Sequence, residues 1–277
     1  MSKRHSFYVA DGEQLIPTVF CQGPWSPEHQ HGGPPTAALA RALRLAMADE
    51  GWRLSRLAFD LLRPVPMAPM RFEVEELRKS RSTWRWRARL IVDGKALIEV
   101  QALALRREPV ELPEVAALDA RRRSSGVGRA LISPPRAPEL CQPFLVPIFR
   151  EREGYHRAFE MRLARGVYGE GPTVTWMRAV IDLVAGEAID PSERVLVIAD
   201  SCNGLSPVVD PRVTTFINAD LSANIVRDLS GEWIAVAAQT ELTTEGCGLA
   251  TGHLYDRAGW IGVAAQTLIV RRAKPVS

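Results

Sequence analysis

The residues His31-Gly32-Gly33-Pro34-Pro35 have the types and spacing of a chemically useful helix start. Glycine lets a ligand approach the backbone closely, and proline is tolerated in the first helical turn. A helix N-terminus presents free N–H groups and the positive end of a dipole to an anion. The prolines have no N–H, so the expected donors are the N–H groups of Gly32 and Gly33, with the side chain of His31. A plain tight turn with His31 on the surface explains the same residues.

The carboxylate of Asp220 is a second candidate, because residues 217–225 form a mostly apolar, strand-like segment. Burial on such a strand raises the pKa of a carboxyl group toward a value useful for a general base. A base of this kind activates water for attack on a carbonyl. The alternative is a strand-edge residue that faces solvent or pairs with Arg227.

Several other kinds of active site are disfavoured by missing motifs. The chain contains no HExxH, no clustered Cys/His set, no GxxxxGK[ST] and no GxSxG. The nearest approach to a nucleophile elbow, residues 204–207, lacks the second glycine. No metal or redox cofactor is therefore implied, and a serine-nucleophile hydrolase is disfavoured.

The elements that must position these groups repeat along the chain. In the first half, an apolar helix at 36–47 is followed by strand-like runs at 54–62, 71–77, 83–92 and 95–106. In the second half, a strand at 174–184 precedes a helix at 194–203, announced by the N-cap Asp190 and Pro191. Strands are then expected at 213–226, 233–242, 248–255 and 260–270. Asp200 and Asn203 on the second helix either face the site or belong to the helix surface.

An internal repeat supports a duplication. A turn glycine, a strand glutamine and a terminal arginine recur 165 residues apart, as Gly94 and Gly259, Gln101 and Gln266, and Arg106 and Arg271. A charged, proline-rich stretch separates the halves and is typical of a linker. We therefore predict domains at residues 1–110 and 141–277, with a linker at 111–140. The linker's Arg121 to Arg123 run is interpreted as solvated rather than as a phosphate contact.

Bulk composition is that of an ordinary globular protein. The 277 residues are 46% hydrophobic and 24% charged, enough to bury a full core, and the net charge of +3 implies no nucleic-acid partner. Four scattered cysteines and a polar N-terminus predict reduced thiols and a cytoplasmic location. The apolar runs fall far short of the ~18 residues of a membrane span.

Taken in order, these motifs resemble the type II acyl-CoA thioesterases and the wider double-hotdog superfamily. The resemblance spans residues 31 to 272 and depends on order and spacing, since each motif alone is weak. It implies an α+β fold in which each of two hotdog units wraps a curved antiparallel sheet around a long helix. The matching segments are 31–35, 62–64, 94–101, 176–178, 220–227 and 232–233, with Thr240 and Gln266.

The resemblance also implies a catalytic set of Asp, Thr and Gln that activates water for hydrolysis of an acyl-CoA thioester. Matched residue by residue, the set is Asp220, Thr240 and Gln266. The turn before Trp233 is one residue short, so the threonine assignment can slip to Thr243. Asn218, two positions before Asp220 on the same expected strand face, is a competing choice. Ordinary strand polarity is the alternative reading of Thr240 and Gln266, as Gln101 illustrates.

The first half is expected to be catalytically degenerate. The position seven residues before Arg63 is Arg56 rather than an acid, and Asp60 is out of phase. We therefore predict one site per chain, in which Gly33 of the first unit faces Asp220 of the second. The family further implies a homodimer or higher homo-oligomer, with acyl-CoA as the small-molecule partner.

Two other functions remain open. A hotdog hydratase or dehydratase needs a His/Asp pair on the helix, and no acid follows His31 there before Asp49. A non-catalytic protein that binds acyl-CoA or fatty-acyl groups would retain the fold without turnover. The sequence leaves the length and type of the acyl chain undetermined.

Overall fold

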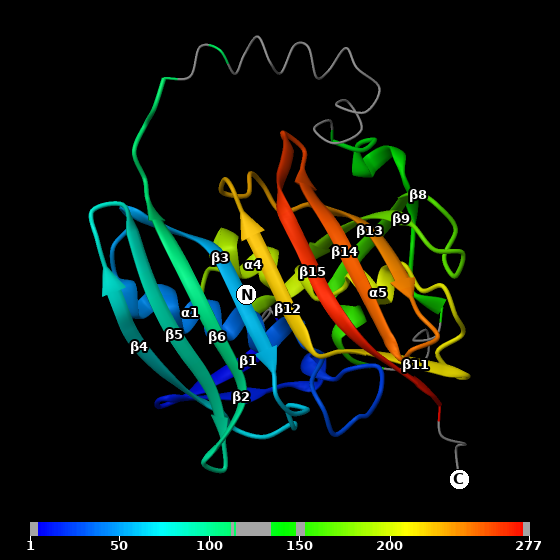
Figure 1. Ribbon diagram of the computed structural model, residues 1–277, viewed down its shortest axis with the longest axis horizontal. Helices are drawn as coiled ribbons and strands as arrows, with labels where there is room; N and C mark the ends of the chain where they lie inside the picture. The colour runs from blue at the N-terminus through cyan, green and yellow to red at the C-terminus, as the bar shows by residue number, and fades with distance from the viewer. Residues whose placement is uncertain (1–4, 112–113, 115–133, 148–152, 274–277) are drawn as a thin grey trace.

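The computed structural model describes residues 5–111, 114, 134–147 and 153–273 (Figure 1). Both halves contain a helix backed by antiparallel strands, as predicted. The Arg121 to Arg123 run lies outside the described residues. None of the helices in the described ranges is long and apolar enough to cross a membrane.

The first half contains one long helix and six strands, and the helix and the last four strands lie within three residues of their predicted ranges. The helix begins at Gly33 because the two prolines occupy its first turn, and it ends in a left-handed residue, Ala48. Half of its buried residues are alanine or leucine, and it packs against both the sheet and the helix of the second half. The elements are β1 (Ser6–Asp11), β2 (Gln14–Pro17), η1 (Val19–Cys21), α1 (Gly33–Met47), β3 (Trp52–Leu61), β4 (Arg71–Lys79), β5 (Thr83–Val92) and β6 (Lys95–Arg106).

The second half repeats this order with a shorter helix. Asp190 caps α4, since its side chain accepts from the Ser192 N–H while Glu193 bonds back to the Asp190 N–H. The predicted helix at 194–203 is in fact two helices, separated at Asp200 and Ser201. The elements are η2 (Pro138–Leu140), β7 (Gln142–Pro143), η4 (Tyr155–Ala158), β8 (Phe159–Arg165), β9 (Thr173–Ala179), β10 (Asp182–Val184), α4 (Pro191–Ala199), α5 (Cys202–Leu205), β11 (Thr214–Asn218), β12 (Asp220–Ile225), β13 (Ile234–Leu242), β14 (Cys247–Asp256) and β15 (Gly259–Arg272).

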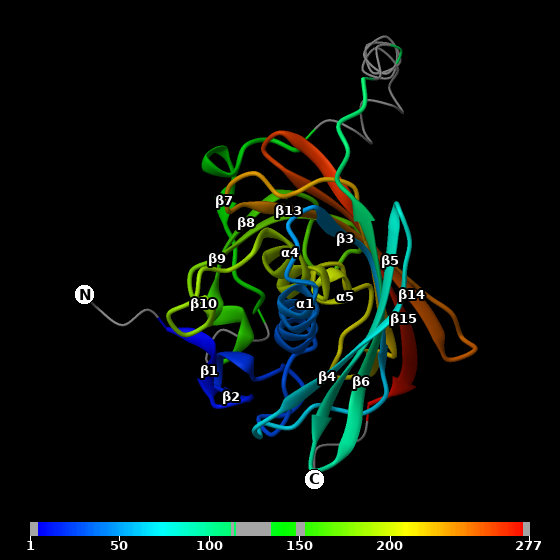
Figure 2. The ribbon, with the colours of Figure 1, turned by 90° about the vertical axis from the view of Figure 1, so that its left-hand side faces the viewer.

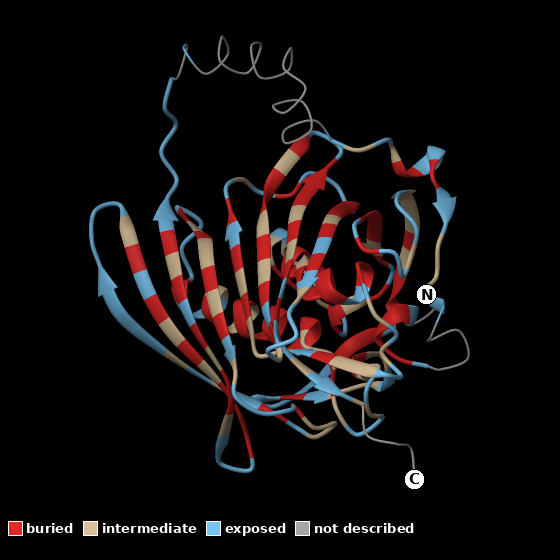
Figure 3. Cartoon of the chain, turned by 45° about the vertical axis from the view of Figure 1, so that its right-hand side comes forward, coloured by how far each residue is buried: buried red, intermediate tan, exposed pale blue. Residues whose placement is uncertain are grey.

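The two halves share one continuous sheet. Within the described residues, twelve strands join in the order β4-β5-β6-β3-β12-β15-β14-β13-β9-β8-β7, with β11 on β15. The junction is the antiparallel pair β3–β12, which runs from Asp60↔Asp220 to Arg56↔Asn224. Figure 2 looks along α1 and shows the sheet curving around it. Buried and exposed residues alternate along the strands, because one face covers the helices and the other faces outward (Figure 3).

The predicted strand at 174–184 is also divided. β9 stays in the large sheet, whereas β10 pairs in parallel with β1 of the first half. β1, β2 and β10 form a separate three-stranded sheet. The N-terminal strand therefore ties the first half to the second.

The repeat spacing is 164 residues in the structure, not 165. The pair Ala58↔Gln101 in β3–β6 corresponds to Ser222↔Ala265 in β12–β15. Gln101 is exposed, whereas Gln266 is fully buried. The predicted match of Gln101 with Gln266 is therefore wrong by one residue, and in a strand one residue exchanges the two faces.

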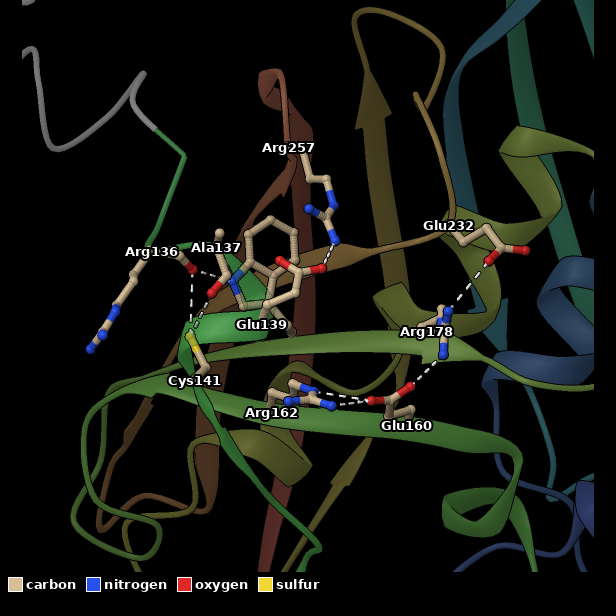
Figure 4. A network of polar contacts seen from close by, with 10 residues as sticks. Arg136, Ala137, Glu139, Cys141, Glu160, Arg162, Arg178, Glu232 and Arg257 are labelled. Atoms are coloured by element: carbon tan, nitrogen blue, oxygen red, sulfur yellow. Dashed lines mark hydrogen bonds and ion pairs between the residues drawn. The ribbon is translucent and has the colours of Figure 1, made fainter.

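The last residues of the predicted linker, together with Cys141, pack on the outer face of the second-half sheet. The Trp176 indole N–H donates to the Arg136 carbonyl at 2.7 Å, and Cys141 is buried beside Trp176. Glu139 forms an ion pair with Arg257 at the β14–β15 turn (Figure 4). These contacts fix the start of the second half against its own sheet.

Candidate functional site

A carboxylate that is almost completely buried lies where α4 ends. Asp200 is 3% exposed and forms the C-cap of α4, after a run of five apolar residues. One carboxylate oxygen, Oδ1, accepts from the Asn218 amide at 2.5 Å and from the Gln266 amide at 2.9 Å. Burial raises the pKa of Asp200 to about 7, against the opposing effect of these hydrogen bonds. A carboxyl group with that pKa changes protonation state near neutral pH.

Gln266 is held rigidly beside this acid. Besides the bond to Oδ1, its amide N–H group donates to the backbone carbonyl of Asp200 at 2.9 Å. Its carbonyl oxygen accepts from the Asn203 N–H at 3.0 Å. Because both ends of the amide are bonded, its donor side is directed at the carboxylate. Of the three predicted catalytic residues, only Gln266 contacts this buried acid.

Asp220 lies on the opposite face of the sheet from Asn218. β11 pairs with β15 at Asn218↔Leu268, but β12 pairs with it at Ser222↔Ala265, so the register shifts by one residue at Ala219. Such a bulge reverses which side chains point inward. Asn218 faces the buried acid, whereas Asp220 is half-buried and accepts from the Thr267 N–H at 2.5 Å. The expectation that Asp220 is a buried base close to Gln266's amide is corrected by this geometry.

Thr240 is on the inner face of the sheet, but it lies too far from Gln266 to act with it. It pairs with Ala250, which in turn pairs with Gln266, so one whole strand separates the two side chains. At the usual strand spacing this is about 10 Å. The Thr240 hydroxyl is bonded to Ser206 at 2.8 Å, and Thr243 is exposed and bonds to the Cys247 carbonyl. Neither threonine is brought to the acid.

The start of α1 meets the acid from the other half of the chain. A side chain on Gly32 would place its Cβ 2.7 Å from Asp200 Oδ2, so the backbone there lies directly against the carboxylate. The backbone N–H groups of Gly32 and Gly33 face Asp200 and lower its pKa. The predicted meeting of a glycine-rich helix start with an acid of the second half is present, with Asp200 in place of Asp220.

His31 completes the polar contacts of the acid. Its Nδ1 lies 3.1 Å from Asp200 Oδ2 and accepts from the Gly33 N–H at 3.1 Å. Burial, with a further contribution from His156, lowers the pKa of His31 to about 3, so the ring is neutral at physiological pH. An Nδ1 that accepts from Gly33 carries no proton of its own. The contact with Oδ2 is therefore favourable when Asp200 holds the proton.

A cavity of about 540 Å³ adjoins this cluster. Its volume is in the range of small-molecule binding sites. Most of the lining side chains are apolar, and they include Met161, Met177 and Phe216. Arg63 lies at the exposed rim beside Leu62.

The corresponding place in the first half is apolar. At the spacing of 164 residues, Leu54 stands for Asn218 and Ala102 for Gln266. Both halves have a bulge at this point, since the β3–β6 register also shifts between Leu54 and Arg56. The backbone is thus repeated, but the polar side chains are not.

The acid itself and one of its partners were considered in the sequence without being chosen. Asp200 was assigned equally to the helix surface, and Asn218 only competed with Asp220. The available signal was the position of Asp200 directly after the apolar run 195–199, on a helix whose buried face includes that run. An acid at the end of a helix buried on most sides is itself buried.

Comparison with known proteins agrees with the fold. A family model described as the acyl-CoA thioesterase N-terminal domain matches residues 21–107, and the C-terminal domain of the same name matches residues 135–270. No curated protein matches the chain significantly in sequence.

Solved structures with the same architecture share little sequence with this chain. An acyl-CoA thioesterase II, TesB2, from Mycobacterium marinum has a TM-score of 0.64 at 13% identity, covering 97% of this chain and 96% of that one. A protein of unknown function with a hot dog fold from Alicyclobacillus acidocaldarius has a TM-score of 0.66 at 18% identity, with coverage of 97% and 96%. The tesB protein of Mycobacterium avium subs paratuberculosis has a TM-score of 0.62 at 17% identity, with coverage of 95% and 96%. At these identities the likeness establishes the fold.

The described elements and their shared sheet define a double-hotdog protein of the α+β class with a buried acid between its two halves. Together, the two matched domains span most of the sequence. The chain belongs to the double-hotdog acyl-CoA thioesterase family.

Proposed function

We propose that this protein hydrolyses acyl-CoA thioesters with water as the nucleophile and Asp200 as the general base. The observation that carries the proposal is the buried carboxylate of Asp200, bonded to two amide donors and facing the N–H groups at the start of α1. Thioester hydrolysis needs a base, groups that orient water and donors for a developing oxyanion. These three requirements are met within one cluster.

In the proposed reaction, ionised Asp200 removes a proton from a water molecule as its oxygen attacks the thioester carbonyl carbon. The carbonyl oxygen gains negative charge, which the Gly32 N–H stabilises, since the Gly33 N–H donates to His31 Nδ1. The tetrahedral intermediate then collapses and the C–S bond breaks. The leaving thiolate takes the proton from Asp200, which restores the carboxylate and releases the acid and free CoA.

The other cluster residues have supporting roles in this proposal. Asn218 and Gln266 hold Oδ1, so that Oδ2 is the oxygen available for proton transfer. His31, neutral, lies beside Oδ2, and its Nδ1 accepts a hydrogen bond from the Oδ2–H group when Asp200 is a carboxylic acid. Arg63 at the cavity rim suits an anionic carrier such as the phosphates of CoA.

The test is thiol release from a panel of short, medium, long and aromatic acyl-CoAs, followed with a thiol-reactive dye. A thioesterase releases one free thiol per acid formed. Saturable binding without thiol release would instead identify a non-catalytic acyl-CoA binding protein.

A hydratase is the second candidate, because the 3.1 Å contact of His31 with Asp200 supplies the acid–histidine pair that such an enzyme needs. The pair comes from two segments of the chain, so it was not visible on the predicted helix. Incubation with a 2-enoyl-CoA distinguishes the reactions, since hydration removes the conjugated absorbance without releasing thiol.

A further inference from the structure

Tyr155 lies face to face with His31. The two ring centroids are 3.7 Å apart and the planes are 3° from parallel. Tyr155 is 6% exposed, and its backbone N–H donates to the Gln22 carbonyl at 3.0 Å, which ties it to the first half of the chain. The histidine ring therefore has little freedom to tilt away from Asp200.

The hydroxyl of Tyr155 forms hydrogen bonds with two residues, one before and one after Asp200 in the chain. It lies 2.6 Å from the Val197 carbonyl and 2.9 Å from Ser201 Oγ. The carbonyl can only accept, so Tyr155 donates to Val197 and Ser201 donates to Tyr155. Burial raises the pKa of Tyr155 far above its ordinary value, so the phenol keeps its proton. Val197 and Ser201 flank Asp200 in the chain, and their bonds to Tyr155 fix the backbone that carries the carboxylate.

The contacts of Tyr155 span the boundary between the two halves. Its ring is stacked on the residue that precedes Gly32, and its hydroxyl is bonded to the end of α4. The backbone of Gly33 touches the Val197 carbonyl so closely that a side chain there would collide with it. A tyrosine with both contacts sets the separation between the N–H donors and the acid.

We propose that Tyr155 is a positioning residue for the hydrolytic reaction, acting through His31 and Asp200. The inference rests on the proposed function. A purely structural role is the competing explanation, because Tyr155 also contacts the rings of Phe7 and Phe159. Core packing needs the ring, whereas positioning also needs the hydroxyl.

Tyr155→Phe separates the two roles, since it keeps the ring and removes both hydroxyl bonds. We expect kcat to fall about tenfold with KM within twofold, since a small misplacement of reacting groups slows the reaction without weakening binding. The midpoint of the kcat–pH profile should move to lower pH, because a looser α4 end admits water to Asp200. Ser201→Ala should resemble it, and the double variant should lose little more than either single one.

Tyr255→Phe is the matched control. This buried tyrosine belongs to the outer cluster with Trp176 and Trp233, away from the cavity. We expect it to leave kcat and the pH midpoint at the values of the unmodified protein.

The proposal is overturned if Tyr155→Phe keeps the kcat and pH midpoint of the unmodified protein. It is equally overturned if kcat falls only in proportion to the unfolded fraction, with the midpoint unmoved. If the unmodified protein releases no thiol, the proposed function fails separately. The ¹³C-carboxyl titration of Asp200 in both proteins then decides: a lower midpoint in Tyr155→Phe supports positioning, and equal midpoints exclude it.

Discussion

At Asp200, the cost of removing charge from water and the gain from hydrogen bonds oppose each other. The side chain is 3% exposed, and desolvation is the largest influence on its pKa. Donation from Asn218, Gln266 and the α1 backbone favours the ionised form without overcoming desolvation. A pKa near 7 suits the proposed role, in which the group accepts a proton and returns it within one catalytic cycle.

Replacing the acid by its amide tests this role. Asp200→Asn has nearly the same shape but no basic oxygen, so thiol release should fall by about 10² to 10⁴. Asp220→Asn is the control, because Asp220 points to the outer face and contacts Thr267. Equal losses in the two variants, measured under identical conditions, would contradict the assignment.

The rate of hydrolysis should depend on pH through the same group. Only ionised Asp200 accepts a proton from water, and burial raises its pKa to about 7. The value of kcat/KM is therefore expected to rise about tenfold per pH unit below 7 and to level above it. A profile that is flat between pH 5 and 8 would exclude Asp200 as the base.

The raised pKa of Asp200 also lowers the free energy of unfolding at neutral and higher pH. Between the unfolded pKa near 4 and the folded value near 7, the folded chain binds the proton more tightly, so stability falls as pH rises. A shift from 3.8 to about 7 corresponds to at most about 4 kcal/mol of unfolding free energy lost above pH 7. Asp200→Asn should therefore be more stable than the unmodified protein at pH 8, by denaturant titration, and the difference should shrink toward pH 4. A difference that grows toward acid would refute the linkage.

At the scale of elements, one residue of strand register decides which groups meet. The bulge at Ala219 turns Asn218 inward and Asp220 outward, and β15 carries Gln266 to the inner face. A bulge adds a residue on one strand only, so simple alternation fails across it. The bulge between Leu54 and Arg56 shows that the feature belongs to both halves.

The two glutamines that appear equivalent in sequence provide a test of register. Gln266→Ala leaves the buried Asn203 N–H without its acceptor, so stability should fall by about 1–3 kcal/mol and thiol release by at least about tenfold. Gln101→Ala changes an exposed side chain and should stay within about 0.5 kcal/mol. Thermal unfolding and the thiol assay measure both. Comparable effects at the two positions would mean that the register is misassigned.

At the scale of the whole molecule, the site belongs to neither half alone. Gly32 and Gly33 come from the first half, and Asp200, Asn218 and Gln266 come from the second. The duplication has a second place of this kind, where the start of α4 meets the end of α1. There Arg44 of α1 forms ion pairs with Glu193 and Asp190. The carboxylates there are paired with a guanidinium, so the duplication does not repeat the arrangement found at Asp200.

One acyl-CoA should accordingly bind per chain. Calorimetric titration of the protein with a non-hydrolysable acyl thioether of CoA should give a stoichiometry of one. The Asp200→Asn variant keeps the cavity, so with an intact acyl-CoA thioester it is also expected to give a stoichiometry of one. A stoichiometry of two per chain would show that the first-half position also binds.

The sequence by itself determined α1 with its glycine-rich start, the capped start of α4, most strands and the duplication. Those features depend on local patterns: apolar periodicity, N-capping by Asp190 and the prolines after Gly33. The resemblance to the double-hotdog family, rather than a local pattern, predicted Gln266 as a site residue and an acid of the second half opposite Gly33.

Only the tertiary structure decided which acid that is. Asp220 and Asp200 both follow apolar residues, and their burial differs because a bulge turns one outward while the end of α4 directs the other at α1. Such bulges and helix breaks depend on pairing with strands distant in sequence, which no local pattern encodes. Tertiary contacts therefore decided which side chains form the site.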